Sequence, residues 1–320
     1  LARAVALSPR APRASVEVGW GEVPIEIVPG VSLAGYGSRA GVPHTGVHDR
    51  VFARALAVRA GGEPVVFLAL DLLLVDRGLR QSLAARLASV VSIDRVVLTA
   101  SHSHGSVGGY APGLVYSLVL GDFDARAHDA VVTAAAAAVA SAVAALEPGK
   151  VVLGEVEAPG LASNRVRKSG APVDPVAGVL LAERTRDGAR AALVSYAAHA
   201  TTVSDQELRV TADYPGVMVE ALRAQGLAWA AFAAGAVGSM APRAGWSEHP
   251  GAAWTGQALA AAVGSQLPRL AARLSGESPV VALASTLVLP EPQWRLGDTW
   301  AVPSLFASWF APSAGPVVAV

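Results

Sequence analysis

The segment PVVFLALD, residues 64–71, decides the fold that we expect for this chain. It is an unbroken apolar run that ends at the carboxylate of Asp71. Continuous apolar runs of this length are typical of strands buried on both faces, which requires helices on each side of the sheet. Two later segments repeat the layout and end in histidine, RVVLTASH at 95–102 and AALVSYAAH at 191–199. Together they predict an α/β fold with a mixed, largely parallel β-sheet flanked by helices.

Helical patterns separate and follow these strands, and we expect helices at residues 77–90, 127–146, 217–224 and 255–274. The first carries leucine at helical spacing and joins the first strand to the second, which makes a βαβ unit. Asp213 is a plausible N-cap for the third helix, and Pro268 should kink or split the fourth. A last strand is expected at 279–289, followed by a loop over 290–316.

The composition excludes several classes of protein. The 320 residues are 52% hydrophobic and 16% charged, which is enough apolar material for a large core. Lys and Arg together number 25, as do Asp and Glu, so we expect no nucleic-acid partner. The alanine-rich run at 131–146 is too short and too weakly apolar to span a bilayer. Because the chain has no cysteine, any zinc ion would be held by His, Asp, Glu or Tyr.

The ends of the sequence suggest a processed chain or a fragment. It begins at Leu1 without a Met and ends on the apolar run PVVAV, which reads like a strand cut midway. We therefore expect one domain over residues 1–320, truncated at its C-terminus.

Two histidines two positions apart follow the second strand, in Ser101-His102-Ser103-His104-Gly105. In extended backbone, residues i and i+2 point to the same side, so both imidazoles can face one metal ion. The alternative is that one or both only form hydrogen bonds in a loop. Gly108 and Gly109 follow, and they would let the backbone pass close to a ligand or simply form a tight turn.

His199 and Asp71 occupy the same position at the ends of the other two strands. A lone histidine there is either a metal ligand or a core residue with satisfied hydrogen bonds, and Asp71 either orients a ligating imidazole or caps a turn. In open α/β sheets, ligands gather outside the carboxyl ends of the strands. The shared placement therefore predicts a site at this edge, where the three polar residues converge on one crevice.

Several blocks of the chain, from about Glu26 to Pro242, resemble the neutral, non-lysosomal ceramidase family. The first resembles that family's opening block, with IEIVPG, AGYGS, GVHDRVFARALAV and VVFLALD in order. TASHSHGSVGGY is similar to the Gly-Thr-His-Thr-His-Ser-Gly-Pro-Gly-Gly signature, and SYAAHATTV to the block with the second zinc histidine. AFAAGAVGSMAP resembles a block that normally reads Gly-Asp-Val-Ser-Pro.

The resemblance implies a single Zn²⁺ ion and hydrolysis of the amide bond of ceramide. Carried over by position, His102 and His199 are zinc ligands, and His104 is a catalytic residue that lines the site or orients the zinc-bound water. Asn164 and Arg165 match part of a block beside the substrate pocket, as Gly108 and Gly109 do in the signature. Asp71 and Asp213 would support the ligands. A lipid or lipid-like amide, peripheral membrane contact and a secreted or periplasmic location follow from the same resemblance.

Two departures from the family bear on activity. Ala241 stands where the family has an active-site serine, so the catalytic hydroxyl would have to come from elsewhere, with Ser239 two positions away as a candidate. No block before Val320 matches the one that supplies the family's further Glu and Tyr ligands.

Three hypotheses therefore remain open from the sequence. The chain could be a ceramidase-type zinc hydrolase, a family-related enzyme that uses zinc hydroxide on another substrate, or a degenerate member that binds metal or lipid without turnover.

Overall fold

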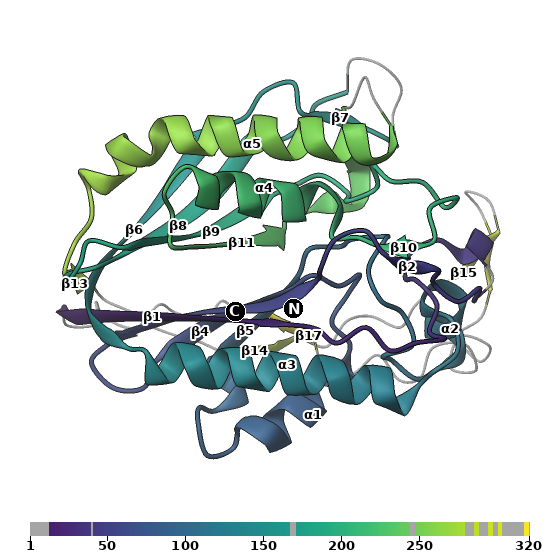
Figure 1. Ribbon diagram of the computed structural model, residues 1–320, viewed down its shortest axis with the longest axis horizontal. Helices are drawn as coiled ribbons and strands as arrows, with labels where there is room; N and C mark the ends of the chain where they lie inside the picture. Colours follow the sequence, from purple (N-terminus) through teal and green to yellow (C-terminus); the bar gives the residue numbers. More distant parts are fainter. Residues whose placement is uncertain are drawn as a thin grey trace.

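The computed structural model describes most of the chain, in the ranges 13–39, 41–166, 171–243, 247–278, 285–287, 294–296, 300–302 and 317–319. In this part of the chain, two sheet layers lie face to face and helices cover the outer face of each (Figure 1). The expected α/β architecture, a mixed sheet flanked by helices, is confirmed.

The two layers belong to one sheet with the strand order β11-β9-β8-β6-β1-β3-β4-β5. One layer contains β1 (Ala14–Pro24), β3 (Phe52–Ala60), β4 (Val65–Leu70) and β5 (Val96–Ala100). The other contains β6 (Glu147–Glu157), β8 (Val176–Arg184), β9 (Arg190–Tyr196) and β11 (Trp229–Ala234). A short strand, β13 (Glu277–Ser278), pairs with β1. Only Glu17 and Val18 of β1 pair with β6, so the layers are joined by a narrow connection and can face each other.

Parallel pairing is limited to β4 with β5 and β9 with β11, and the other strands of this sheet pair antiparallel. The reason lies in the connections, because only these two pairs are joined by crossovers that contain a helix. The strands that lead to Asp71, His102 and His199 are β4, β5 and β9, so each belongs to one of the two parallel pairs.

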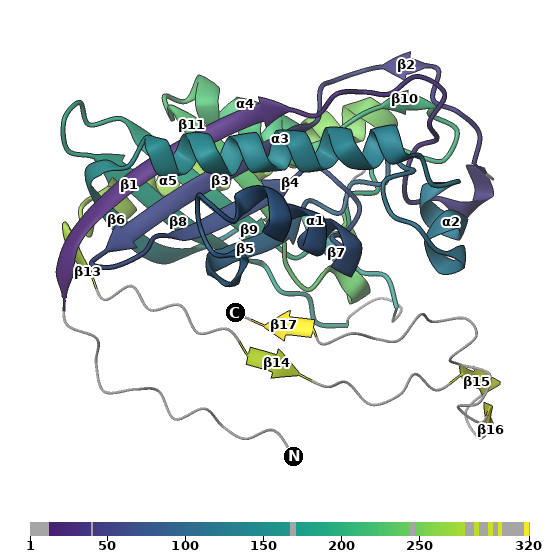
Figure 2. The ribbon, with the colours of Figure 1, turned by 90° about the horizontal axis from the view of Figure 1, so that it is seen from below.

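Four longer helices form the outer layers: α1 (Arg77–Leu87), α3 (Ala125–Ala144), α4 (Asp213–Ala224) and α5 (Glu248–Ala271). Figure 2 shows α1 and α3 on the side of β1, β3 and β4, with α4 and α5 behind the other layer. The remaining helical elements are short: α2 (Leu114–Leu120), η1 (Gly37–Arg39), η2 (Ile93–Arg95) and η3 (Val237–Ser239). Helix α3 is long and apolar enough to cross a membrane by length and composition, yet its buried face packs on β1 and β3.

Helix α5 runs through Pro268 without being split, and the alternative of a kink at this residue stays a prediction. The expectation about the start of α4 is corrected. Asp213 is the first residue of α4 rather than its N-cap, which is Ala212, and Asp213 itself has a φ of 57°. Its carboxylate accepts hydrogen bonds from backbone N–H groups, and this stabilises a conformation that non-glycine residues rarely adopt.

Small two-stranded sheets complete the described fold: β2 (Gly46–Val47) with β10 (Arg209–Val210), β7 (Ala162–Asn164) with β12 (Met240–Pro242), β14 (Ser285–Leu287) with β17 (Val317–Ala319), and β15 (Trp294–Leu296) with β16 (Trp300–Val302). Of the strand expected at 279–289, the structure describes β14, and the rest lies outside the described residues. The loop expected over 290–316 contains β15 and β16, so that expectation was wrong for these residues.

The apolar residues form a core in each interface between layers. One cluster lies between α1, α3 and their sheet layer, and another lies between α4, α5 and theirs. A third fills the space between the two sheet layers and includes Val18, Leu56, Leu193 and Trp229. Because every strand of the sheet contributes to a buried face, the ends of β5 and β9 are held firmly relative to each other.

The close approach of β1 to α3 generates a prediction about stability. A Cβ atom on Gly19 would lie 2.3 Å from the carbonyl oxygen of Ala142, so Gly19→Ala must push the helix away. We expect the free energy of unfolding to fall by about 1–3 kcal/mol, as for other overpacked sites. Urea denaturation of the variant and the unchanged protein measures this difference in the free energy of unfolding. Gly178→Ala is the matched control, because its Cβ would lie 3.9 Å from the nearest atom, in Ser195. Equal stability of the two variants would contradict the close packing.

Candidate metal centre

Three histidines meet where β5 and β9 end. The Nε2 atoms of His102 and His199 lie 2.9 Å apart, and Nε2 of His104 lies 3.4 Å from Nε2 of His102. One ring nitrogen from each of the three lies within 4.8 Å of the other two. The expectation that His102 and His199 are close enough to share one ion is therefore confirmed in distance.

The backbone brings these side chains together by pairing the two segments after the strands. Ser103 and Ala200 form an isolated parallel bridge, and the N–H of His104 donates to the carbonyl oxygen of Ala200 at 3.2 Å. His102 has a φ of 61°, which is uncommon for a residue with a side chain and is seen mainly where the surroundings enforce it. The first histidine is thus held in an unusual backbone conformation at the point where the ring nitrogens converge.

Backbone carbonyls fix the tautomers of two of the rings. Nδ1 of His102 donates to the carbonyl oxygen of Leu73 at 2.8 Å, and Nδ1 of His199 donates to that of Val237 at 2.6 Å. Since a carbonyl oxygen only accepts, the proton of each neutral ring is on Nδ1 and the lone pair is on Nε2. An imidazole whose other nitrogen donates to a carbonyl is the usual arrangement of a metal ligand.

The electrostatics keep all three imidazoles neutral. Burial is the main cause of the lowered pKa of His102 and His199, and the neighbouring charges of the site add to it. Burial, together with His102 and His199, lowers the pKa of His104 to about 3. Nδ1 of His104 is buried and has no hydrogen-bond partner in the described part of the chain. Three neutral nitrogen donors so close together are compatible with a metal ion.

The two aspartates expected to support the ligands do so only indirectly. The Asp71 carboxylate is buried, pairs with Arg54 at 2.6 Å and accepts from the backbone N–H of Phe52. Asp213 accepts from the backbone N–H groups of Thr202 and Val203, just after the third histidine. The direct orienting role expected of Asp71 is corrected, because carbonyl oxygens take that place. Both aspartates instead fix the backbone near the site.

The glycines of the signature approach protein rather than an open site. A Cβ on Gly108 would lie 2.2 Å from the carbonyl oxygen of Leu120, and one on Gly109 would lie 2.9 Å from the side chain of Val31. Both glycines are buried. The small size of Gly108 and Gly109 allows this loop to pack closely against its neighbours, and their contact with substrate stays a prediction.

The remaining candidates lie on β7, β12 and the turn before β12. Arg165 is exposed, its Nε donates to the carbonyl oxygen of Gly238 at 3.0 Å, and its charge contributes to the lowered pKa of the three histidines. Asn164 is half-buried, and its side-chain amide donates to the carbonyl oxygen of Pro172. Ser239 is exposed within η3, whereas Ala241 is half-buried on β12. The structure therefore places Arg165 against the turn that contains Ser239, with hydrogen bonds to the carbonyl oxygens of Gly238 and Ser239.

The sequence analysis missed Arg39, which is buried at 4% exposure without a carboxylate partner in the described chain. Its guanidinium donates to five backbone carbonyls: those of Ala34, His104, Ser204, Asp205 and Glu207. The bond to His104 is 2.5 Å long. The ring of Tyr36 contacts both groups: its centroid lies 4.8 Å from Cζ of Arg39 and 4.9 Å from the centroid of the His104 imidazole. Nothing in the sequence pattern distinguishes this arginine from a surface residue.

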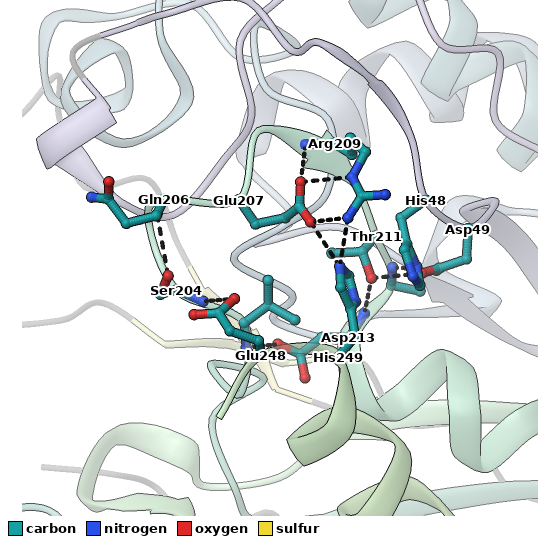
Figure 3. A network of polar contacts seen from close by, with 12 residues as sticks. His48, Asp49, Ser204, Gln206, Glu207, Arg209, Thr211, Asp213, Glu248 and His249 are labelled. Atoms are coloured by element: carbon teal, nitrogen blue, oxygen red, sulfur yellow. Dashed lines mark hydrogen bonds and ion pairs between the residues drawn. The ribbon is translucent and has the colours of Figure 1, made fainter. Parts of the chain in front are cut away.

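The loop at residues 204–207 accepts hydrogen bonds from Arg39 on one side. On its other side it is held by a polar network, shown in Figure 3. The Glu207 carboxylate accepts from Arg209 and pairs with His249 at 2.8 Å. The hydrogen bond from Arg209 is the main cause of the strongly lowered pKa of Glu207. The ring of His249 stacks on that of His48 with centroids 3.5 Å apart. The loop is therefore held both from the buried side and from the surface.

A family model described as "Neutral/alkaline non-lysosomal ceramidase, N-terminal" matches residues 17–246. The neutral ceramidase of Pseudomonas aeruginosa is 29% identical over 133 residues, which cover 40% of this chain and 20% of that protein. The neutral ceramidase of Drosophila melanogaster is 32% identical over 111 residues, 33% of this chain and 16% of the relative. These alignments therefore span about a fifth or less of the relatives' length.

Solved structures show the same fold. The crystal structure of neutral ceramidase from Pseudomonas aeruginosa superimposes with a TM-score of 0.71 and 22% identity, covering 81% of this chain and 45% of that one. A structure titled "Ceramidase complexed with C2" gives a TM-score of 0.73 over 81% of this chain and 44% of its own, also at 22% identity. The chain thus spans less than half of either solved protein.

The contacts of Arg39 generate a second prediction. Arg39→Met leaves buried carbonyls without donors, and we expect the free energy of unfolding to fall by about 2–4 kcal/mol. Because one of these carbonyls belongs to His104, Zn²⁺ affinity should also fall, by about tenfold or more. Urea denaturation and a zinc titration of the folded protein measure the two effects. Arg126→Met, at an arginine with 68% side-chain exposure, is the control. Unchanged zinc affinity in Arg39→Met would contradict the link to His104.

Proposed function

Because the chain belongs to the neutral/alkaline non-lysosomal ceramidase family, we propose that it is a zinc-dependent hydrolase that cleaves the amide bond of ceramide or of a related lipid-like substrate. One observation carries the proposal: nitrogen atoms of three neutral imidazoles, from His102, His104 and His199, lie within 4.8 Å of one another at the ends of two strands. His199 is buried and the other two are partly buried, so the cluster is an enclosed set of nitrogen donors without a carboxylate between them.

The donor set favours zinc as the metal. Three imidazole nitrogens and no thiolate suit Zn²⁺, which would be held by Nε2 of His102 and His199. When bound, zinc lowers the pKa of a water molecule to about 7 and polarises a carbonyl, which are the contributions that amide hydrolysis needs.

Other groups of the chain orient the histidine rings and stabilise charge at the site. The carbonyls of Leu73 and Val237 hold the two ligating rings in the required tautomer. His104 is neutral at pH 7 because its pKa is about 3, so it can complete the donor set or accept a hydrogen bond within the site. The guanidinium of Arg165 is near enough to influence all three rings and can attract the negative charge that develops on a substrate carbonyl.

An apolar surface beside the site supports a lipid substrate and peripheral contact with a membrane. Helix α2 exposes Leu114 and Leu118, each at 65%, and the neighbouring Phe123 is 46% exposed. The end of α2 bonds to Gly35, whose backbone packs directly on His104. Apolar side chains of this kind can enter the boundary between lipid headgroups and acyl chains. A secreted or periplasmic location is part of the same proposal, and cell fractionation tests it.

Ala241 favours a second candidate function, in which the chain binds metal or lipid without turnover. Alanine offers no hydroxyl at a place where the family resemblance leads us to expect one. Loss of one hydrogen-bond donor to a developing oxyanion typically slows an enzyme by about 100- to 1000-fold. An enzyme that acts on another small amide or ester is the intermediate possibility, since attack by zinc-bound water requires no serine.

The ligand assignment predicts different losses of zinc in two variants. His102→Ala removes a bond to the ion, whereas Asp71→Ala removes only a side chain that pairs with Arg54 and supports the backbone. We expect His102→Ala to lose most of its zinc and Asp71→Ala to lose clearly less. Elemental analysis of the folded, purified proteins decides the comparison. Equal losses would place Asp71 among the ligands.

The reaction is tested with a fluorogenic ceramide and His199→Ala. We expect the full-length protein to cleave the substrate and the variant to lose at least about 100-fold in kcat/KM together with its zinc. A protein that leaves ceramide intact but cleaves other amides or esters, again in a manner that depends on His199, would assign another substrate. A protein that binds lipid and zinc but cleaves nothing would establish the function without turnover.

A further inference from the structure

The short antiparallel pair of β7 and β12 carries a hydroxyl group, on Ser163, close to Ala241. In this pair Ala241 lies directly opposite Ser163, and Met240 lies opposite Asn164. Residues directly opposite each other in an antiparallel pair project to the same side, with Cβ atoms about 4.5–5.5 Å apart. Ser163 therefore presents its side chain beside the methyl group of Ala241.

The neighbours of the pair identify which side this is. Met240 is 4% exposed and belongs to the core under α4 and α5, so Ala241 and Ser163 project away from that core. The carbonyl oxygen of Met240 accepts from the backbone N–H of His199 at 3.1 Å. β12 therefore runs immediately alongside the third histidine.

The pairing of the two segments continues beyond β7 at Arg165. Arg165 follows Ser163 by two residues, and its N–H donates to the carbonyl oxygen of Ser239. In extended backbone such residues share a side. Ala198 and Ala200 belong to the same core as Met240, so the imidazole of His199 between them projects away from that core, on the side that carries Ser163 and Ala241.

We propose that Ser163 supplies the hydroxyl donor that Ala241 cannot, so that the hydrogen bond to the substrate carbonyl oxygen comes from β7 instead of β12. The inference rests on the proposed function and deepens it by naming a catalytic residue. Ser163 is half-buried on a paired strand, whereas Ser239 is exposed in the η3 turn. A donor on a paired strand needs less reorganisation during the reaction than one in an exposed turn.

The proposal is tested in zinc-loaded protein with Ser163→Ala, Ala241→Ser and the double variant. With fluorogenic ceramide, we expect Ser163→Ala to lower kcat by about 100-fold or more with unchanged zinc content. Adding Ala241→Ser to that variant should restore at least about tenfold, because the new hydroxyl arises across the same strand pair. Ser195→Ala is the control, since Ser195 is also half-buried on a strand.

A second measurement does not require turnover. The carboxylate of a long-chain fatty acid, the acid product of amide cleavage, should bind to the zinc-loaded protein and accept the same hydrogen bond. We expect its dissociation constant to rise about tenfold in Ser163→Ala, as for loss of a hydrogen bond to a charged group, and to stay unchanged in Ser195→Ala.

The outcomes separate this inference from the proposed function. If Ser163→Ala keeps its kcat and its affinity for fatty acid while His199→Ala loses activity, the hydrolase stands and the role of Ser163 is overturned. If Ser239→Ala loses activity instead, the hydroxyl comes from the turn, and the inference is again wrong. If the protein cleaves nothing but Ser163→Ala still weakens fatty-acid binding, the proposed hydrolysis fails while the position of the hydroxyl is upheld.

Discussion

The hydrogen bonds from Nδ1 of His102 and His199 to backbone carbonyls are the interactions on which the rest of the site depends. They place both lone pairs on Nε2, so that the two nitrogens can lie 2.9 Å apart without a proton on either in the ligating state. Carbonyl oxygens carry no full charge, so they orient the rings while leaving them neutral. The carbonyls themselves come from the segments after β4 and β11, the strands paired in parallel with β5 and β9. The two parallel pairs therefore supply both His102 and His199 and the carbonyl groups that orient them.

The sequence was informative wherever a regular pattern met a polar residue. Apolar runs ending at Asp71, His102 and His199 predicted both the buried strands and the convergence of the two histidines, because strand ends are fixed by the sheet. The sequence was less informative about which side chains form hydrogen bonds or ion pairs with each other. Asp71 has the right residue type and position to orient a histidine ring. Its carboxylate instead forms an ion pair with Arg54 on the neighbouring strand. Pairing between strands is set by register, which a single strand does not reveal.

The loops could not be predicted, because their contacts join residues far apart in the chain. Arg39 reaches carbonyls near residue 205 and that of His104, and no local pattern marks an arginine that will be buried without a carboxylate. Its desolvation is offset by oriented backbone carbonyls and by the charges of nearby carboxylates, including those of Asp205 and Glu207, so the loop and the cation stabilise each other. For Gly108 and Gly109 the sequence did suggest a role, and the structure shows a further one. Their motif suggested room for a ligand, but the room is filled by neighbouring backbone and side-chain atoms of the protein itself.

The low pKa of His104 bears on its role. A general base is most effective when its pKa lies near the working pH, and a value of about 3 makes this imidazole a poor proton acceptor at pH 7. A metal ligand has the opposite requirement, since it must be unprotonated to bind. The Nε2 of His104 lies 3.4 Å from that of His102, within the cluster rather than beside it. The His104 imidazole thus lies where a third nitrogen donor would, and Arg39 holds its backbone there through the carbonyl oxygen.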